Sequence, residues 1–511
     1  MMKLQVHEGS TGILSLRDEQ GTTSQFIPNY DMDEAISLLI EFQQIPDALH
    51  PDKLLKDNYR SNNRNWYPTM VSYLFWYFFF PFVKYRLLIE QIRENKISCH
   101  CENAGTFSTL LHNLNIPQHA TWKAKLHNAF LHLSNRLTAL RKRNAEVVFY
   151  RFNRIDFRAV EIRAALKKMG VEILNVGPPS AFTDILKNIF ASQPELFFGS
   201  LPTANAFQHN YDLKAAELWK RQLFTDAIRY METTITALQN EYKCHLNTLR
   251  PLKAHTFYGL DDINAHFFPI FFACRDHGMR TVGHQHGAYV KRHAGYIMNG
   301  INPGDFEWYD RVIVWGNYWK EKILRDAPAH PGDRFVVGSN KFSNRHISPL
   351  PPHQPPKSIL VPYEFLANTA LIGRYICAFQ KIGYRVFFKP RADEPLEDQL
   401  AAYCLPTENC AALEIMTTID AASMAQIDVI AGSMTTLIYE LLPYGKIIWY
   451  LETEYRHLED LVEEGLAHSI SLEEINSIAV EKFIPTGIIA EEFFASHTLE
   501  ATLHAYVVSR N

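Results

Sequence analysis

Short apolar runs alternate with amphipathic segments along most of the chain, which is the pattern of β-α-β units. The strands of the first part are expected at 146–151, 171–176, 256–259, 280–283, 312–316 and 334–338. The helices between them are expected at 120–142, 157–169, 212–242, 264–277 and 318–324. Strands that alternate with helices in this way predict a parallel sheet covered by helices.

A proline-rich segment from Ser348 to Pro356 divides this pattern, because proline can continue neither a helix nor a central strand. Beyond it, strands are expected at 358–362, 385–389, 414–416, 428–431 and 446–450, with helices at 368–382, 420–425 and 435–442. Helical stretches are expected again at 472–482 and 490–508. We therefore predict an α/β fold of two Rossmann-like domains facing a cleft, with extra helices at the N-terminus. The expected parts are a first domain (1–345), a linker (346–357), a second domain (358–484) and a C-terminal helix (485–511) that packs back on the first domain.

The N-terminal part of the sequence shows a less regular spacing of apolar residues. Residues 1–65 are poorly periodic, with one short helix expected around 32–44. The apolar, aromatic segment 70–83 falls short of the ~20 residues that a membrane-spanning helix needs and contains a proline. It predicts a buried helix that continues to Ile89, and the alternative is a patch at a membrane interface.

Composition narrows the class of protein. The chain has 511 residues, 47% of them hydrophobic, and a formal net charge of −4, which suits a soluble protein of two or three domains and gives no reason to bind nucleic acid. Its seven cysteines show no CxxC pair and are odd in number, so a reducing cytoplasm is expected. Cys99-His100-Cys101 lacks the ligand spacing of a zinc site. No signal peptide is expected at the N-terminus.

The segment Thr281 to Tyr289 is the strongest candidate for chemistry, since it places His284 and His286 in a glycine-containing turn directly after a strand. Asp261 and Asp262 follow the preceding strand, so all four residues are expected at the carboxyl edge where open α/β sheets bind ligands. His286 is the preferred catalytic residue, and Asp261 is the preferred carboxylate. The alternatives are a hydrogen-bonded core histidine and a helix N-cap at Asp261.

A second candidate motif, Gly432-Ser433-Met434-Thr435-Thr436, follows a strand of the second domain and opens a helix. Free N–H groups and hydroxyls at a helix start bind phosphate. Gly432, Ser433, Thr435 and Thr436 are therefore predicted to bind a phosphate group. Ser433 and Thr435 also fit the plainer role of helix caps.

Further candidates for binding the same ligand surround that motif. Lys389 and Arg391 close another strand on either side of a proline, and their charges suit a phosphate or a sugar carboxylate. Glu440 is placed to accept from a ribose diol, and Glu364, which follows the strand at 358–362, is included in the same set. Exposed loop charges and a solvated helix glutamate are the alternatives.

Two weaker catalytic candidates are Glu102 and Asp156, each of which follows an apolar or strand-like segment. A carboxylate in a cleft can serve as a general base toward a hydroxyl or as a nucleophile on an anomeric carbon.

These motifs and their order resemble the GT-B glycosyltransferases of bacterial capsule and lipopolysaccharide assembly. The closest resemblance is to enzymes that use CMP-activated sugars such as Kdo, and a more distant one is to the CDP-glycerol glycerophosphotransferases. It covers roughly residues 250–455 and rests on Gln285-His286-Gly287, on Gly338-Ser339-Asn340 and on the motif from Gly432 through Tyr439-Glu440.

The resemblance implies that His286 lies near the donor phosphate, that Ser433, Thr435 and Thr436 bind that phosphate, and that Glu440 lies near the ribose or base. It implies a nucleotide-sugar donor, a glycan or glycolipid acceptor, no cofactor and no catalytic metal. Two positions depart from the family. Lys389-Pro390-Arg391 stands where many relatives have His-Pro, and Gly338-Ser339-Asn340 stands for a Gly-Asn-Pro turn.

The sequence therefore predicts a cytoplasmic glycosyltransferase, at most peripheral to the inner face of the membrane. A nucleotide-sugar 2-epimerase shares the double-Rossmann architecture and is the first alternative. A non-catalytic scaffold subunit of a glycan assembly complex is the second, since residues 1–100 are unassigned. The acceptor, the linkage and the choice between CMP and UDP stay open at this level.

Overall fold

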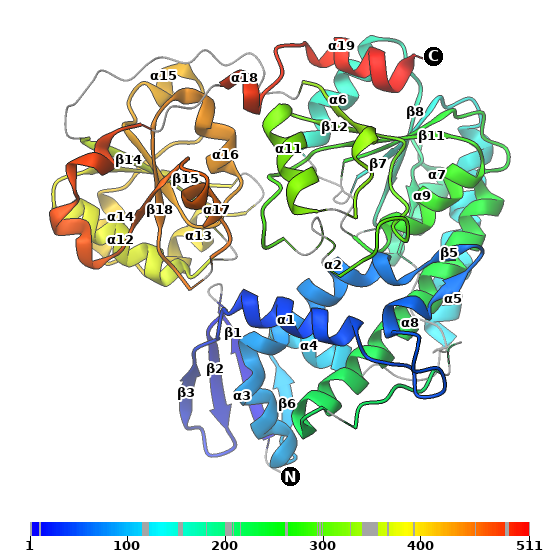
Figure 1. Ribbon diagram of the computed structural model, residues 1–511, viewed down its shortest axis with the longest axis horizontal. Helices are drawn as coiled ribbons and strands as arrows, with labels where there is room; N and C mark the ends of the chain where they lie inside the picture. The colour runs from blue at the N-terminus through cyan, green and yellow to red at the C-terminus, as the bar shows by residue number, and fades with distance from the viewer. Residues whose placement is uncertain are drawn as a thin grey trace.

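The computed structural model of the chain has three parts, an N-terminal region (residues 3–114), a first α/β domain and a second α/β domain (Figure 1). In Figure 1 the second domain lies at the left, the first at the upper right and the N-terminal region below them. The structure describes residues 3–9, 12–114, 122–151, 157–179, 181–199, 207, 209–214, 216–260, 264–293, 295, 298, 300–327, 329–339, 356–364, 367–391, 394–454, 456–485 and 490–509.

The first domain is built on a seven-stranded parallel sheet. Its strands are β7 (Val147–Tyr150), β8 (Ile173–Gly177), β9 (Leu196–Phe197), β10 (Thr256–Gly259), β11 (Arg280–His284), β12 (Arg311–Val314) and β13 (Phe335–Val337). Their order, β13-β12-β11-β10-β7-β8-β9, is the Rossmann order, in which the chain starts at a central strand, builds outward and then returns to the centre. The order reverses between β7 and β10, so the topological switch point lies at the carboxyl ends of these two strands.

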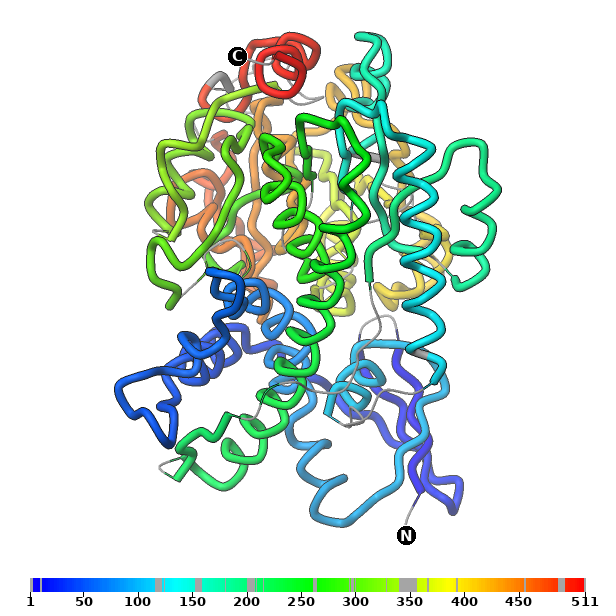
Figure 2. Tube along the Cα trace, turned by 90° about the vertical axis from the view of Figure 1, so that its right-hand side faces the viewer, coloured from blue at the N-terminus to red at the C-terminus, as the bar shows by residue number. Residues whose placement is uncertain are grey.

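The helices of the first domain are α5 (Trp122–Arg141), α6 (Phe157–Lys168), α7 (Phe182–Phe190), α8 (Leu218–Leu249), α9 (Phe267–Asp276) and α11 (Asn317–Asp326). α8 begins later than the expected residue 212 because the side chain of Asp212 accepts from the N–H of Lys214 and forms a turn there. It then continues to Leu249, and Figure 2 shows it running from the N-terminal region up into the first domain.

The second domain repeats the same topology with six parallel strands. They are β14 (Ser358–Pro362), β15 (Arg385–Lys389), β16 (Glu414–Ile415), β17 (Val429–Gly432), β18 (Ile447–Leu451) and β19 (His468–Ile470), in the order β16-β15-β14-β17-β18-β19. Its helices are α12 (Thr369–Lys381), α13 (Leu396–Ala402), α14 (Thr407–Ala411), α15 (Ala421–Met424), α16 (Leu437–Leu441) and α17 (Asp460–Glu463). The two sheets confirm the predicted α/β fold of two Rossmann-like domains.

The helix expected over 472–482 is wrong. The strand β19 precedes two short 3-10 turns, η6 (Glu473–Ser477) and η7 (Val480–Phe483), which an extended backbone at Ile478 and Ala479 separates. The expected linker falls almost entirely outside the described residues, which resume at Pro356.

The N-terminal region contains a sheet that the sequence pattern did not predict. β1 (Lys3–Glu8), β2 (Leu14–Asp18) and β3 (Thr23–Phe26) form antiparallel pairs, and β6 (Ser98–Cys101) adds parallel to β1. Residues 1–65 are therefore not a poorly structured lead-in. The signal is weak because these strands are short and largely exposed, and because β1 and β6 are far apart in the sequence.

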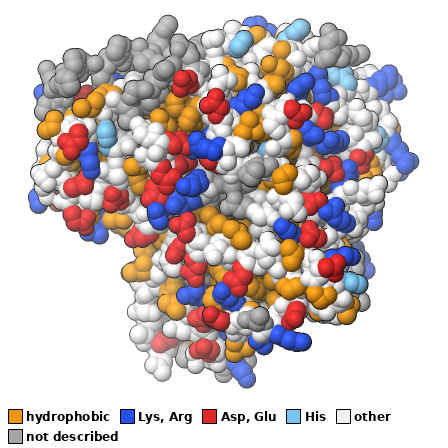
Figure 3. Space-filling model, viewed as in Figure 1, with side chains coloured by type: hydrophobic (Ala, Val, Ile, Leu, Met, Phe, Trp, Pro, Cys, Tyr) orange, Lys and Arg blue, Asp and Glu red, His pale blue; other side chains and the backbone are white. Residues whose placement is uncertain are grey.

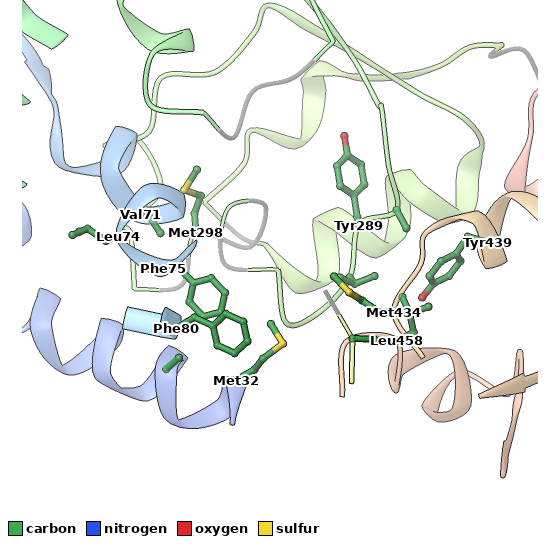
Figure 4. Packing of buried hydrophobic residues seen from close by; sticks show 14 of the residues in the cluster. Met32, Val71, Leu74, Phe75, Phe80, Tyr289, Met298, Met434, Tyr439 and Leu458 are labelled. Carbon is green, nitrogen blue, oxygen red and sulfur yellow. The ribbon is translucent and has the colours of Figure 1, made fainter. Parts of the chain in front are cut away.

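The remaining elements of this region are mainly helical. They are α1 (Met32–Gln43), η1 (Leu55–Asp57), the hairpin β4 (Arg60–Ser61) and β5 (Arg64–Asn65), η2 (Tyr67–Met70), α2 (Val71–Leu74), the π-helical segment η3 (Phe75–Phe79), α3 (Phe80–Glu94) and α4 (Thr106–Leu114). We call α2, η3 and α3 together the aromatic helix. It is the expected buried helix, since Phe75, Phe78 and Phe79 have no exposed surface. Figure 4 shows Phe75 and Phe80 packed with Met32 of α1. Among the described helices, none combines the length and the apolar character that crossing a bilayer requires.

The C-terminal segment lies on the first domain. It comprises α18 (Ala490–Phe493), α19 (Leu499–Leu503) and the π-helical η8 (His504–Val508). α18 contacts α11, and α19 contacts α6. The single helix expected over 490–508 is interrupted at Thr498, whose side chain accepts from the N–H of Ala501 and starts α19 anew.

Candidate functional site

Loops that follow the carboxyl ends of strands in both sheets meet at the boundary between the domains. The loop after β11 brings Gly287 close to Thr436, which follows β17, so that a Cβ on Gly287 would lie 3.9 Å from Cγ2 of Thr436. Further along this loop, the N–H of Lys291 donates to Asp460 at 3.3 Å. Figure 4 shows Tyr289 of the same loop beside Met434 and Leu458 of the second domain. Because Rossmann sheets bind ligands at this edge, the boundary is the candidate site.

His286 lies in this boundary loop with a partly buried side chain. It is one of three neighbouring histidines, since burial and the charges of His457 and His286 together lower the pKa of His293. The rings of His293 and His457 are 6.1 Å apart, and burial lowers the pKa of His457 to about 3. His293 also contacts Trp76 of the aromatic helix, with 5.5 Å between ring centroids. Both domains and the N-terminal region therefore contribute rings to this place.

Gln285 fixes the turn that presents His286, and the sequence reasoning gave it no role. Its side chain accepts from the N–H of Trp315 at 3.0 Å and donates to the carbonyl of Gly287 at 2.9 Å. The indole of Trp315 donates back to the carbonyl of Gln285 at 2.8 Å. The sequence shows a glutamine between two histidines, which is a weak signal for a structural role. Its partner Trp315 follows β12, so the contact could not be predicted from the local sequence.

The structure turns His284 away from the boundary. Its ring is buried in the sheet, where Nδ1 and the hydroxyl of Tyr258 are hydrogen-bonded at 2.6 Å. Burial lowers the pKa of His284 to about 4, so the ring is neutral near pH 7. This environment is that of a core histidine.

The carboxylate of Glu364 fills the predicted anion site in the second domain. Glu364 follows β14 and is 1% exposed. Its oxygens accept from the N–H groups of Ser433, Met434 and Thr435, each at 2.9 Å, and from the hydroxyl of Ser433 at 2.8 Å. Burial raises the pKa of Glu364, and the hydrogen bonds from the loop oppose this rise without cancelling it. We call this set of hydrogen bonds from residues 433–435 to Glu364 the Glu364 clamp. A Cβ on Gly432 would lie 2.5 Å from Glu364 Oε1, so the clamp requires glycine there.

The clamp changes which groups are available to a ligand. The N–H groups that the sequence assigned to a phosphate already serve Glu364. The helix α16 begins only at Leu437, later than expected, and the hydroxyl of Thr435 accepts from the N–H of Leu437 at 3.3 Å. Thr435 and Thr436 keep partly exposed side chains, and Thr436 is the one that faces Gly287.

Two buried hydroxyls near this clamp have no hydrogen-bond partner among the described residues. Tyr450 stands opposite Gly432 in the register of β17 and β18, and its hydroxyl is one of them. Burial and the nearby carboxylates of Glu459 and Glu364 raise the pKa of Tyr450. The other hydroxyl is that of Thr369, at the first residue of α12. A buried hydroxyl without a partner costs about 1–3 kcal/mol, so a bound polar molecule would be stabilised here.

Lys389 and Arg391 lie together at the carboxyl end of β15. The ammonium group of Lys389 donates to the carbonyl of Pro390 at 2.7 Å. The side chain of Gln399 holds the peptide group of Arg391 through two hydrogen bonds of 2.9 Å. The Arg391 guanidinium lies 3.9 Å from the carboxylate of Glu394. Both cations are at the ligand-binding edge of the sheet and are held there by the second domain itself.

The remaining predicted residues lie in α16, in the N-terminal sheet or outside the described residues. Glu440 lies half-buried within α16. Glu102 follows β6 in the N-terminal sheet, where its exposed carboxylate is 3.6 Å from His7. It therefore does not belong to the first Rossmann sheet. Asp156, Asp261 and Asp262 lie outside the described residues.

Ion pairs that the sequence reasoning missed cross the boundary. Arg292 lies 2.9 Å from Asp33 of α1 and 2.9 Å from Glu459 of the second domain, so it joins all three parts. Lys322 of α11 is 1% exposed and lies 2.7 Å from Asp460 and 2.6 Å from Glu464. Figure 3 shows acidic and basic side chains mixed where the second domain adjoins the rest of the molecule. The sequence offered no signal for these pairs, because each partner sits in an ordinary charged loop or helix.

The strand order of both sheets and the meeting of their carboxyl edges define a protein of two Rossmann-like domains, the GT-B arrangement. No protein-family model matches the chain, and no curated protein matches it. Among solved structures it is similar to MurG of Acinetobacter baumannii, with 15% identity over 66% of this chain and 88% of that one and a TM-score of 0.34.

It is also similar to CalG4, the calicheamicin glycosyltransferase, with 14% identity over 71% and 95% of the two chains and a TM-score of 0.41. A UDP-GlcNAc 2-epimerase of Methanocaldococcus jannaschii, solved with UDP-GlcNAc and UDP, matches at 8% identity over 71% and 100% of the two chains, with a TM-score of 0.41.

Proposed function

We propose that the chain is a glycosyltransferase that moves a sugar from a nucleotide donor to a bacterial surface polysaccharide or lipopolysaccharide. The observation that carries the proposal is the unpartnered hydroxyl of Tyr450 beside Gly432, at the ligand-binding edge of a Rossmann sheet that faces the His286 loop. The fold alone would not be sufficient, because Rossmann-like pairs serve many reactions.

The donor binds the second domain in this proposal. Tyr450 and Thr436 supply hydroxyls, and Lys389 and Arg391 supply positive charge for a phosphate or for the carboxylate of an acidic sugar. Glu364 acts indirectly, since it fixes the loop that carries Thr436. Glu440 lies deeper in α16 and would accept from the ribose. The choice of a CMP-linked donor, with Kdo as the first sugar to test, follows from the resemblance of the motifs at 285–287 and 432–440.

The reaction uses charge stabilisation at the leaving phosphate. His286 lies next to Gly287, which faces Thr436, and in this proposal its imidazole acts from the first-domain side of that phosphate. Preorganised donors that face developing charge typically contribute about 3–4 kcal/mol each. No metal enters this scheme. The acceptor, a glycan or glycolipid, would approach from the first domain at the inner face of the cell membrane.

The first test is thermal unfolding of the purified chain with CMP, CDP, UDP, GDP and ADP in separate samples. A nucleotide at 100 times its dissociation constant should stabilise the protein by about 2.7 kcal/mol. We expect CMP to produce this shift, and sugar transfer from CMP-Kdo to a soluble lipopolysaccharide oligosaccharide should follow. If none of the five nucleotides raises the unfolding temperature, the proposal is wrong. A shift with UDP and conversion of a UDP-sugar without acceptor would replace it by an epimerase.

Tyr450→Phe tests the donor site itself. Loss of one hydrogen bond of about 1.4 kcal/mol should weaken CMP binding roughly tenfold, while the free protein keeps or gains stability because an unpartnered buried hydroxyl is removed. Tyr375→Phe is the matched control. The Tyr375 hydroxyl already donates to the carbonyls of Glu452 and Ile470, so this variant should lose stability and keep its affinity. Equal CMP affinity in Tyr450→Phe and the unaltered protein would place the donor elsewhere.

A further inference from the structure

The switch point of the first sheet carries a histidine that the sequence did not single out. His266 follows β10 and stands directly before α9, at the carboxyl edge where β7 and β10 part. Open Rossmann sheets bind ligands in the crevice at this point. In the second sheet the equivalent place lies between β14 and β17, and the side chain of Glu364 occupies it. In the first sheet an imidazole lies there instead.

Glu241 of α8 holds this imidazole. Its side chain is fully buried, and Oε2 lies 3.0 Å from Nδ1 of His266. The other oxygen accepts from the N–H of Gly199 at 2.9 Å and lies 3.4 Å from Nε2 of His245. Burial raises the pKa of Glu241, but the two histidines outweigh it, and the result lies well below the ordinary value. An ionised carboxylate only accepts hydrogen bonds, so Nδ1 of His266 carries the proton.

This tautomer leaves the lone pair of His266 on Nε2. No described residue forms a hydrogen bond with Nε2, and the side chain is 19% exposed. A histidine whose first nitrogen is fixed by a buried carboxylate and whose second nitrogen reaches solvent has the arrangement of a general base with its orienting partner.

Aromatic rings extend from His266 toward the boundary between the domains. Phe198 stacks on the His266 ring at 6.2 Å, and Tyr73 of the aromatic helix meets it edge-on at 6.2 Å. Tyr77 packs against Tyr73 at 4.5 Å and is 37% exposed. Trp76 of the aromatic helix contacts His293 of the boundary loop. Large ring faces beside a few fixed polar groups are what a concave site needs to hold a sugar by its C–H face and its hydroxyls.

We propose that His266 is the general base for the acceptor hydroxyl, that Glu241 is its positioning residue, and that Tyr73 and Tyr77 hold the acceptor sugar. The assignment rests on the proposed glycosyl transfer. In the step, the acceptor O–H bond breaks and its proton goes to Nε2 of His266. The acceptor oxygen forms a bond to the anomeric carbon, and the bond from that carbon to the donor phosphate breaks, so the nucleotide leaves with the electron pair.

His266→Asn is the decisive variant, and His277→Asn is its matched control. His277 lies at the opposite end of α9 and is exposed, and its Nε2–H donates to the carbonyl of Leu246 at 2.8 Å. With CMP-Kdo and a de-O-acylated lipopolysaccharide oligosaccharide as probes, His266→Asn should lower the transfer rate about 100-fold or more. Its thermal shift with CMP should equal that of the control. Equal transfer rates in the two variants would overturn the proposal, and so would loss of CMP binding in His266→Asn alone.

Glu241→Gln separates positioning from chemistry. Glutamine no longer fixes the proton on Nδ1, so we expect a loss of transfer rate that is smaller than in His266→Asn. The titratable groups that contact His266 in the described chain include Glu241 itself and Tyr73, with His245 behind Glu241. Position 241 is buried, so the substitution can lower the folded fraction, and the measurement uses folded protein only. Histidine ¹⁵N spectra should show the Nδ1-protonated form of His266 in the unaltered protein and a mixture of tautomers in Glu241→Gln. An unchanged tautomer would overturn the positioning role.

Failure of the proposed function has a different signature. If the unaltered protein binds no nucleotide and transfers no sugar, saturation-transfer NMR with the same oligosaccharide still decides the fate of this site. Binding that persists in His277→Asn and is lost in His266→Asn and Tyr77→Ala would retain His266 as part of a sugar-binding site. No binding to the unaltered protein would overturn it.

Discussion

At the residue scale, the two histidines of the 281–289 segment have opposite environments although they are two positions apart. His286 lies in the boundary loop, whereas His284 is buried against Tyr258. The buried ring has a pKa near 4, compared with about 6.5 in an unfolded chain. Between these values the unfolded chain binds a proton that the folded chain does not. Stability is therefore lost as the pH falls from about 6.5 toward 4.

His284→Asn tests this linkage. The difference in pKa corresponds to at most about 3 kcal/mol of stability between pH 7 and pH 4. The variant should be less stable at pH 7 but should lose stability less steeply on acidification. Urea unfolding at several pH values measures both. His277→Asn, at an exposed position, should keep the slope of the unaltered protein. If the unfolding free energy of His284→Asn falls with pH as steeply as that of the unaltered protein, His284 does not change its protonation on unfolding.

At the element scale, the short α18 completes the first domain from the far end of the chain. Phe493 packs on Tyr318 with 4.2 Å between ring centroids, and its carbonyl accepts from the indole of Trp319 at 3.1 Å. A Cβ on Gly316 would lie 2.2 Å from the carbonyl oxygen of Glu492, so the glycine allows the two backbones to approach. A helix of four residues has little stability of its own, and these contacts hold it.

Phe493→Ala should therefore destabilise the protein by about 3–5 kcal/mol, the usual cost of emptying a buried phenylalanine site. Chemical unfolding monitored by tryptophan fluorescence suits the measurement, because Trp319 lies at the contact. Phe190→Ala is the control, since Phe190 is 89% exposed. The expectation fails if the two substitutions have similar small effects.

At the scale of the whole molecule, buried charge joins the domains. Lys322 of the first domain has its ammonium group between Asp460 and Glu464 of the second, and Tyr439 donates to Asp460 at 3.1 Å. Removing one partner of a buried ion pair leaves an uncompensated charge, which typically costs 3–5 kcal/mol. Lys322 is thus the buried member of a set of cations, with Lys291 and Arg292, that pair with carboxylates of the second domain.

Lys322→Ala should lower the melting temperature and separate the unfolding of the second domain from that of the first, so that calorimetry shows two transitions. Lys322→Met, which fills the same space without charge, should also weaken the junction, because Asp460 loses its cationic partner in both variants. Lys168→Ala removes an exposed pair with Glu500 and should change stability by less than about 1 kcal/mol. A single unshifted transition in Lys322→Ala would contradict the buried role of this lysine.

The sequence alone was sufficient to predict most strands of both Rossmann sheets, although it missed the short edge strands β9 and β19. Central parallel strands are buried on both faces and therefore appear as continuous apolar runs, such as Val147–Tyr150 and Ile447–Leu451. The regular return of such runs after helical segments predicts parallel sheets with helical crossovers, whereas the strand order is set by the tertiary structure. The glycine-containing turns after β11 and β17 were predicted for the same reason, since they directly follow such runs.

Only the tertiary structure decided which partner each polar side chain has. The Glu364 clamp, the Glu241–His266 pair and the Lys322–Asp460 pair each join residues that are distant in sequence. The pairing of β1 with β6 is equally distant. A local pattern reports whether a position is buried, because burial repeats with the period of a helix or strand. It does not report what a carboxylate or an imidazole meets, because that contact is made by another element whose position depends on the packing of the whole chain.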